Sequence, residues 1–340
     1  MIRIGINGFG RIGRCVFRIL SQRDDVEVVA INDVGNRSQL VYLLRYDTVM
    51  RAFPGEITYD KSAETIGVKT GSADWNVRVL SERDPTRLPW KELGVDIAIE
   101  STGVFRKRAQ IAGHLEAGAS RVVLTVPAKD PIDRTIVLGV NDDELSADDR
   151  IVSNASCTTN CLAPLAKVLD EKLGGIRKGF MTTVHAFTND QRLAAKPHSD
   201  PRRSRAAAQN IIPTTTGAAK AVGVVLPNLK GRLDGIALRV PVPDGSVVQL
   251  VTEMNEDVTC DGVRAAMKEA AEGPMKGIMQ YSNDPLVSTD ILGNPHSSIF
   301  DANYTQVTNG KILNTMAWYD NEWGYSNRVC DLITKLHALG

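Results

Sequence analysis

The chain has 340 residues, and its 40 basic and 40 acidic side chains leave no formal net charge at pH 7. At roughly 150 residues per domain this length predicts two domains, and a composition of 43% hydrophobic and 24% charged residues excludes disordered, fibrous and coiled-coil proteins. The balanced charge also disfavours nucleic acid as a partner, because binding to a phosphate backbone depends on an excess of lysine and arginine.

Two further classes of protein are disfavoured. No apolar run reaches the roughly 18 to 20 residues that a membrane-spanning helix needs, and the first residues contain no apolar signal segment. The five cysteines lack the dense spacing of a disulfide framework, which is typical of free thiols in a reducing compartment. We therefore expect no membrane association and a cytoplasmic location.

The first elements in the chain predict a dinucleotide site. Isoleucines alternate with other residues over 2–6, which predicts a strand, and this strand runs into a GxGxxG loop at Gly8–Gly13. A helix and a second strand over 26–31 follow. Such glycines let the backbone approach a pyrophosphate at the start of a helix, and Asp33 after the second strand would accept hydrogen bonds from an adenosine ribose. That acid favours NAD over NADP.

The rest of the chain extends this pattern and then changes. Further strands of a parallel sheet are predicted at 96–100, 121–126, 135–140 and 150–153, with a helix at 107–117. Past residue 157 the predicted elements are strands at 235–240 and 246–255 and helices at 261–272 and 322–339. We therefore predict an α/β fold, in which a doubly wound (Rossmann) dinucleotide-binding domain is joined to a second α+β domain.

Cys157 is a candidate nucleophile. It lies between a predicted strand and the helical pattern of Leu162, Leu165 and Leu169, so we expect it at a helix N-terminus, where the helix dipole lowers the pKa of a thiol. Cys161 follows one turn later, and two small buried residues would explain this Cys-x3-Cys pair equally well. No metal site is predicted, because no third or fourth ligand is near.

His185 is a candidate base for that thiol. It ends the predicted strand 181–184, where a side chain can project into a crevice. A single histidine is more often a structural residue, but a reactive thiol needs a partner that moves protons at neutral pH. The pairing of His185 with Cys157 is therefore a hypothesis at this stage.

Two segments are candidate phosphate sites. The first is the basic cluster 201–205, at the end of the polar stretch 186–205. The second is 214–218, where hydroxyls and free amides are predicted to open a helix. The arginines would equally suit a solvated or subunit-contact face, and the threonines would equally suit a helix cap.

Four segments resemble the signatures of one family, the phosphorylating glyceraldehyde-3-phosphate dehydrogenases, and the resemblance extends over essentially the full length. The segments are 6–14 (INGFGRIGR), 155–160 (ASCTTN), 210–220 (NIIPTTTGAAK) and 318–326 (WYDNEWGYS). The resemblance implies an NAD-binding domain over 1–156, completed by the C-terminal helix 320–340, and a catalytic domain over 157–319. It also implies a homotetramer with subunit contacts in the segment 186–205.

The resemblance further implies roles for individual residues. Cys157 would be the nucleophile and His185 its base. The residues implied near the substrate phosphate or the reacting group are Ser156, Thr158, Thr188, Asp190 and Arg239. Those implied for a second anion site, which delivers inorganic phosphate, are Arg202, Arg203, Thr216 and Gly217. Those implied for NAD are Arg11, Ile12, Asp33, Arg83, Thr125 and Asn321.

The implied reaction is the phosphorylating oxidation of glyceraldehyde 3-phosphate to 1,3-bisphosphoglycerate with NAD, in glycolysis or gluconeogenesis, through a cysteine hemithioacetal and a thioester. One alternative is an erythrose-4-phosphate dehydrogenase. Another is an NADP-tolerant form, because Lys196 stands where NAD-strict members often carry leucine. The alternatives from another class are a non-catalytic NAD-binding protein and a redox sensor built around Cys157.

Overall fold

The computed structural model describes all 340 residues, which divide into two units. The first unit comprises Met1–Ile136, Asp143–Ala155 and Ser326–Gly340, and the second comprises Val137–Asp142 and Ser156–Tyr325. Compared with the division implied by the resemblance, Val137–Asp142 joins the second unit and the chain returns to the first unit at Ser326 instead of residue 320.

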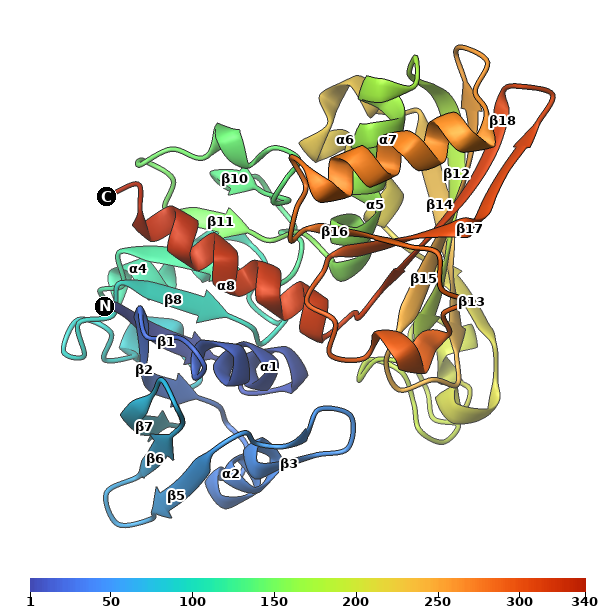
Figure 1. The fold of residues 1–340 in the computed structure, drawn as a ribbon. Coiled ribbons are helices and arrows are strands. Elements are labelled where there is room, and N and C mark those ends of the chain that lie inside the picture. Colours follow the sequence, from blue (N-terminus) through green and yellow to red (C-terminus); the bar gives the residue numbers. More distant parts are fainter. The chain divides into compact units, whose positions relative to one another are not determined.

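The first unit is built on a nine-stranded sheet in the order β10-β11-β9-β8-β1-β2-β7-β6-β5 (Figure 1). Its strands are β1 (Ile2–Asn7), β2 (Val26–Asn32), β5 (Glu56–Asp60), β6 (Thr65–Lys69), β7 (Asp74–Leu80), β8 (Ile97–Glu100), β9 (Arg121–Leu124), β10 (Arg134–Thr135) and β11 (Ile151–Ser153). A separate hairpin pairs β3 (Tyr46–Asp47) with β4 (Arg51–Ala52). The helices are α1 (Arg11–Leu20), α2 (Arg37–Arg45), α3 (Arg108–Ile111), α4 (Gly113–Glu116) and most of α8 (Trp323–His337).

The strand order confirms the predicted doubly wound sheet. The strands β7-β2-β1-β8-β9-β11 are all parallel. Dinucleotide-binding sheets have this arrangement, in which the order of successive strands along the sheet reverses near its middle. The reversal falls between β1 and β8. Ligands bind such sheets in the crevice beyond the carboxyl ends of the strands at that point, which here are Asn7 and Glu100.

Two predicted elements of this region were wrong in extent. The strand predicted over 135–140 ends at Thr135, because Gly139 adopts a φ of 80° and the Asp142 carboxylate accepts a 2.8 Å hydrogen bond from its nitrogen. Such a turn cannot continue a strand. The helix predicted over 107–117 is split into α3 and α4, with Gly113 opening the second piece.

The second unit is a seven-stranded mixed sheet with helices on one face (Figure 1). Its order is β13-β14-β12-β15-β18-β17-β16. The strands are β12 (Ile176–Ala186), β13 (Ile212–Thr215), β14 (Leu233–Val240), β15 (Ser246–Met254), β16 (Met279–Ser282), β17 (Ser298–Thr308) and β18 (Ile312–Tyr319). The helices are α5 (Cys157–Lys172), α6 (Ala218–Val225) and α7 (Cys260–Glu272).

The core of the second unit holds α5 against the sheet. Leu162, Leu165 and Leu169 are each completely buried, and burial of one such side chain contributes roughly 1.5 to 3 kcal/mol. This packing is what gives the first turn of α5 a defined position. None of the helices in the chain combines the length and apolarity needed to cross a membrane.

Candidate active site

Cys157 lies at the start of α5, as predicted. Ser156 is the N-cap, and its Oγ accepts a 3.1 Å hydrogen bond from the Thr159 nitrogen. Ala155 precedes it with a φ of 52°, a left-handed conformation that is unfavourable for a residue with a side chain. The chain thus makes a sharp, strained turn into the helix immediately before the thiol, and nothing in the sequence indicated this turn.

His185 meets Cys157 within the second unit. The Nε2 atom lies 3.5 Å from the Cys157 Sγ, and the ring is 4% exposed near the end of β12. The ring of Tyr319 packs edge-on against the imidazole, with 5.9 Å between centroids. The Tyr319 hydroxyl in turn lies 2.8 Å from Thr158 Oγ1 and from Thr183 Oγ1. Tyr319 was missed as a site residue, although it belongs to the signature at 318–326.

Arg239 lies on the far side of the imidazole. Strand β14 pairs with β12 so that Arg239 is directly opposite His185, and its Nη1 lies 2.7 Å from His185 Nδ1 and 3.0 Å from the Ala186 carbonyl oxygen. A guanidinium can only donate hydrogen bonds. Nδ1 would therefore accept from Arg239, but it also lies 2.7 Å from the Ala186 carbonyl oxygen, which can only accept, so the two neighbours favour opposite tautomers of the ring.

Burial dominates the electrostatics of the pair. Burial raises the pKa of the Cys157 thiol, and the Arg239 guanidinium opposes this with a smaller effect. Burial lowers the pKa of His185 to about 3, and Arg239 acts in the same direction. The direction of the shift at Cys157 is thus opposite to the low thiol pKa expected at a helix N-terminus.

A second cluster joins Thr188, Asp190 and Arg203. The Thr188 hydroxyl donates to the Asp190 carboxylate, which lies 2.5 Å from Arg203 Nη1. Arg203 Nε also donates to Thr214 Oγ1 over 2.9 Å. Burial raises the pKa of Asp190, but the hydrogen bond from Thr188 and the charges of Arg239 and Arg203 outweigh it, so the pKa lies below its ordinary value.

The other predicted phosphate residues lie apart from this cluster or act as caps. Arg202 lines a different cavity of about 430 Å³ with Arg205 and Ile211. The segment 214–218 opens a helix as predicted, although its first two residues, Thr214 and Thr215, belong to β13 and α6 itself begins at Ala218. Thr216 Oγ1 accepts from the Ala218 nitrogen over 3.2 Å, and Gly217 is the N-cap.

The glycine-rich loop borders a cavity of about 410 Å³ in the first unit. Gly8 has a φ of 93°, and a Cβ there would lie 2.5 Å from the Thr102 nitrogen, whereas a Cβ at Gly10 would meet nothing within 4 Å. Gly8 thus allows a close backbone approach, and Gly10 leaves room beside the start of α1. Asp33 and Arg83 line the same cavity, so the residues present fit a dinucleotide.

The remaining predicted cofactor residues have partners of their own. Arg11 forms an ion pair with Asp47 in the first turn of α1, where Ile12 also lies. Thr125 Oγ1 donates to the carbonyl oxygen of Glu100 over 3.2 Å. In the second unit, Asn321 Oδ1 accepts a 2.6 Å hydrogen bond from Ser246 Oγ.

All five cysteines are free thiols. No group of three or more histidine, cysteine or acidic side chains is arranged to hold a metal ion. Cys161 is completely buried, and its Sγ lies 3.8 Å from Ser298 Oγ, so it packs within the core while Cys157 faces His185.

Comparison with known proteins identifies the family to which these residues belong. Residues 2–108 match the model of the glyceraldehyde 3-phosphate dehydrogenase NAD binding domain, and residues 156–321 match that of the C-terminal domain. The chain is 56% identical to a glyceraldehyde-3-phosphate dehydrogenase of Streptomyces coelicolor over 334 residues, 97% of each chain. It is 54% identical to glyceraldehyde-3-phosphate dehydrogenase 1 of Bacillus subtilis over 340 residues, 100% of this chain and 99% of the relative.

Proposed function

Because the chain belongs to the glyceraldehyde-3-phosphate dehydrogenase family, an NAD-binding family of oxidoreductases, we propose that it oxidises glyceraldehyde 3-phosphate to 1,3-bisphosphoglycerate with Cys157 as nucleophile. The observation that carries this proposal is the 3.5 Å contact between Cys157 Sγ and His185 Nε2, with Arg239 on the opposite side of the ring. The reaction serves glycolysis or gluconeogenesis.

His185 acts as a base once Arg239 turns toward the phosphate of the substrate. The Nδ1 atom, 2.7 Å from the Ala186 carbonyl oxygen, then donates to that oxygen, and Nε2 accepts the thiol proton. The sulfur attacks the aldehyde carbon, and the protonated Nε2 gives its proton to the carbonyl oxygen, which forms the hemithioacetal. His185 takes this proton back as the carbon is oxidised to the thioester.

Bound NAD supplies the hydride acceptor for that oxidation. Asp33 would accept hydrogen bonds from the adenosine ribose, and the backbone at Gly8 and Gly10, with the first turn of α1 at Arg11 and Ile12, would face the pyrophosphate. Arg83, Thr125 and Asn321 remain the other proposed cofactor residues, with Asn321 holding the nicotinamide amide.

Two anion sites complete the proposal. Arg239, Thr188, Asp190, Ser156 and Thr158 surround the substrate phosphate or the reacting carbon. The second site, with Arg203, Thr216 and Gly217 and with Arg202 at its edge, supplies the inorganic phosphate whose oxygen attacks the thioester, while the Cys157 sulfur leaves and the acyl phosphate forms.

The deciding experiment is the initial rate of NADH formation from glyceraldehyde 3-phosphate with and without inorganic phosphate. We expect phosphate-dependent turnover that is selective for NAD. A higher specificity constant for erythrose 4-phosphate would replace this function with the erythrose-4-phosphate dehydrogenase. Equal rates with NADP would instead show that Asp33 does not exclude the 2′-phosphate and that Lys196 tolerates it.

The proposed assembly is a homotetramer. On the face of the second sheet opposite the helices, Phe180, Ile236, Val251 and Ile312 are between 37% and 50% exposed, and a second copy would cover such an apolar face. Light scattering should give four times the 37.0 kDa of the chain, and Phe180→Glu should reduce this mass. A monomer at micromolar concentration would contradict the proposal.

The proposed location is the cytoplasm. The reaction needs Cys157 as a free thiol, and the other four cysteines are free as well. Thiols persist in this state in a reducing compartment. Fractionation of the source cells, with the activity recovered in the cytoplasmic fraction, would test this location.

A further inference from the structure

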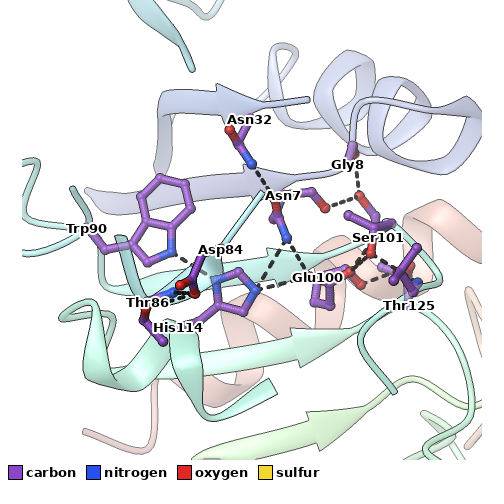
Figure 2. Close-up of polar contacts among 12 residues, drawn as sticks. Asn7, Gly8, Asn32, Asp84, Thr86, Trp90, Glu100, Ser101, His114 and Thr125 are labelled. Carbon is purple, nitrogen blue, oxygen red and sulfur yellow. Dashed lines mark hydrogen bonds and ion pairs between the residues drawn. The ribbon is translucent and has the colours of Figure 1, made fainter. Parts of the chain in front are cut away.

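A continuous chain of buried hydrogen bonds runs beneath the cofactor cavity of the first unit (Figure 2). It begins at Trp90, whose Nε1 lies 3.0 Å from His114 Nδ1. An indole nitrogen can only donate, so Nδ1 accepts and the ring proton of His114 is on Nε2. That nitrogen lies 3.0 Å from Glu100 Oε2, so His114 donates to the carboxylate.

A second chain reaches the same carboxylate from the other side. The backbone nitrogen of Glu82 donates to Asn32 Oδ1 over 2.8 Å. Asn32 must therefore present its Nδ2 to Asn7 Oδ1, at 2.7 Å, and Asn7 presents its Nδ2 to Glu100 Oε2, at 2.6 Å. The backbone donor at Glu82 thus sets the orientation of both amides.

Glu100 is where the two chains converge. The Oε2 atom accepts from His114 and Asn7, and the Oε1 atom accepts from the Thr102 nitrogen at 2.8 Å and from the Thr102 hydroxyl. Glu100, His114 and Trp90 are completely buried. Every group that faces the carboxylate is a hydrogen-bond donor. These donors are satisfied only if the side chain at position 100 has an acceptor atom at both positions.

The Glu100 carboxylate fixes the positions of residues that line the cofactor cavity. Asn7, Asn32, Glu82 and Thr102 all line the cavity, and Gly8 is packed so closely on Thr102 that no Cβ would fit between them. Displacing Thr102 therefore displaces the glycine-rich loop. We propose that Glu100 is a positioning residue for NAD, and that His114 acts through it with an orientation set by Trp90.

The first test is Glu100→Gln in the full-length protein. The glutamine amide places a donor against either the Thr102 nitrogen or the His114 proton, and neither can reverse its direction. We expect NAD binding, measured by calorimetry, to weaken at least tenfold, and KM for NAD to rise while kcat at saturating NAD changes less than twofold. Binding of NAD within twofold of the wild type would overturn the proposal.

A matched pair of variants keeps the test decisive if Glu100→Gln does not fold. His114→Gln keeps a donor near the Nε2 position toward Glu100, whereas His114→Asn keeps an acceptor near Nδ1 toward Trp90 and loses that donor. We expect His114→Gln to bind NAD severalfold more tightly than His114→Asn. Equal affinities would overturn the role of His114, because simple loss of packing affects both variants alike.

The proposal rests on the proposed cofactor site but is separable from the proposed reaction. Calorimetry reads NAD binding without aldehyde turnover. In addition, alkylation of Cys157 by iodoacetamide, measured without NAD, should stay within twofold of the wild type in all three variants, since the thiol and His185 belong to the second unit. A large change of that rate in either direction would instead show that the substitution disturbs the second unit and would contradict a role limited to cofactor positioning.

Discussion

Each of the two units contains one buried histidine in a polar network, and the two networks differ in how fully they are satisfied. His114 has a close partner at each ring nitrogen, Trp90 at Nδ1 and Glu100 at Nε2, with Asn7 Nδ2 also 3.5 Å from Nε2. His185 faces a thiol at 3.5 Å on one side, and on the other side a guanidinium and a carbonyl oxygen compete for the same nitrogen. The first ring cannot change its tautomer without breaking a bond, whereas the second has an alternative partner ready.

The difference separates a histidine that keeps a binding site in position from one that transfers protons at a reacting group. A network in which every donor meets an acceptor is rigid, which suits the floor of a cofactor cavity. A proton-transfer group needs two arrangements of similar energy, and the competition at His185 Nδ1 provides them. Variants of Cys157, His185 and Arg239 would show whether His185 behaves in this second way.

The largest effect is expected from Cys157→Ser. Without the thiol no hemithioacetal or thioester can form, so turnover should fall on the order of 10⁴-fold or more. The matched control is Cys260→Ser, because Cys260 also begins a helix behind a capping threonine but has no histidine beside it. Retained turnover in Cys157→Ser, measured as NADH formation, would remove the nucleophile from the proposal.

His185→Asn should have the next largest effect. Loss of the base should reduce kcat by about 10² to 10⁴-fold with a small change in KM for the aldehyde. His198→Asn is the control, because His198 lies in the second unit but outside the contacts of the thiol. If kcat stayed within a factor of about three, proton transfer by His185 would be excluded.

Arg239→Met should change the pH dependence of the thiol. The guanidinium lowers the pKa of Cys157 against the larger effect of burial, so its removal should move the midpoint of iodoacetamide alkylation to higher pH and slow alkylation at pH 7 severalfold. The paired variant Arg239→Lys keeps a positive charge, so its alkylation midpoint should lie between those of the wild type and Arg239→Met. A midpoint unchanged in Arg239→Met would show that this charge does not reach the sulfur.

The last expected effect concerns stability instead of reactivity. Burial, together with the neighbouring Asp320, raises the pKa of Asp244 to about 9, against about 3.9 in an unfolded chain. Between these values the folded state holds a proton that the unfolded state lacks. The free energy of unfolding should therefore fall as pH rises between these two values, by up to about 1.4 kcal/mol per pH unit, and the loss is complete above about pH 9.

Asp244→Asn tests this directly, because the amide needs no proton. Urea unfolding from pH 6 to pH 9 should show a shallower decline in the variant, which should be the more stable form at pH 9. Parallel curves for the two proteins would mean that Asp244 does not carry this proton.

Sequence patterns predicted the fold of the first unit better than they predicted the detailed geometry of the active site. The GxGxxG loop, the strands beside it and Asp33 follow from local patterns, and the sheet order confirms the fold that they predict. The strand predicted over 135–140 failed because the chain turns at Gly139 and the residues after Ile136 belong to the second unit. The apolar pattern of a short segment does not show which of the two units that segment packs against.

At the active site, the helix start at Cys157 was a local feature and was predicted correctly. The neighbours of His185 were not predictable in the same way. Arg239 lies 54 positions away in the chain and reaches the imidazole only through the pairing of β14 with β12. Tyr319 reaches it through a different strand, β18.

The sequence by itself determined the family, the dinucleotide-binding unit and the two residues at the centre of the proposed chemistry, because these depend on short patterns whose physical meaning is local. The tertiary structure alone decided the protonation of the site. Whether a thiol or an imidazole is charged depends on burial and on charges brought close by strand pairing, and at both Cys157 and His185 burial has the largest effect on the pKa.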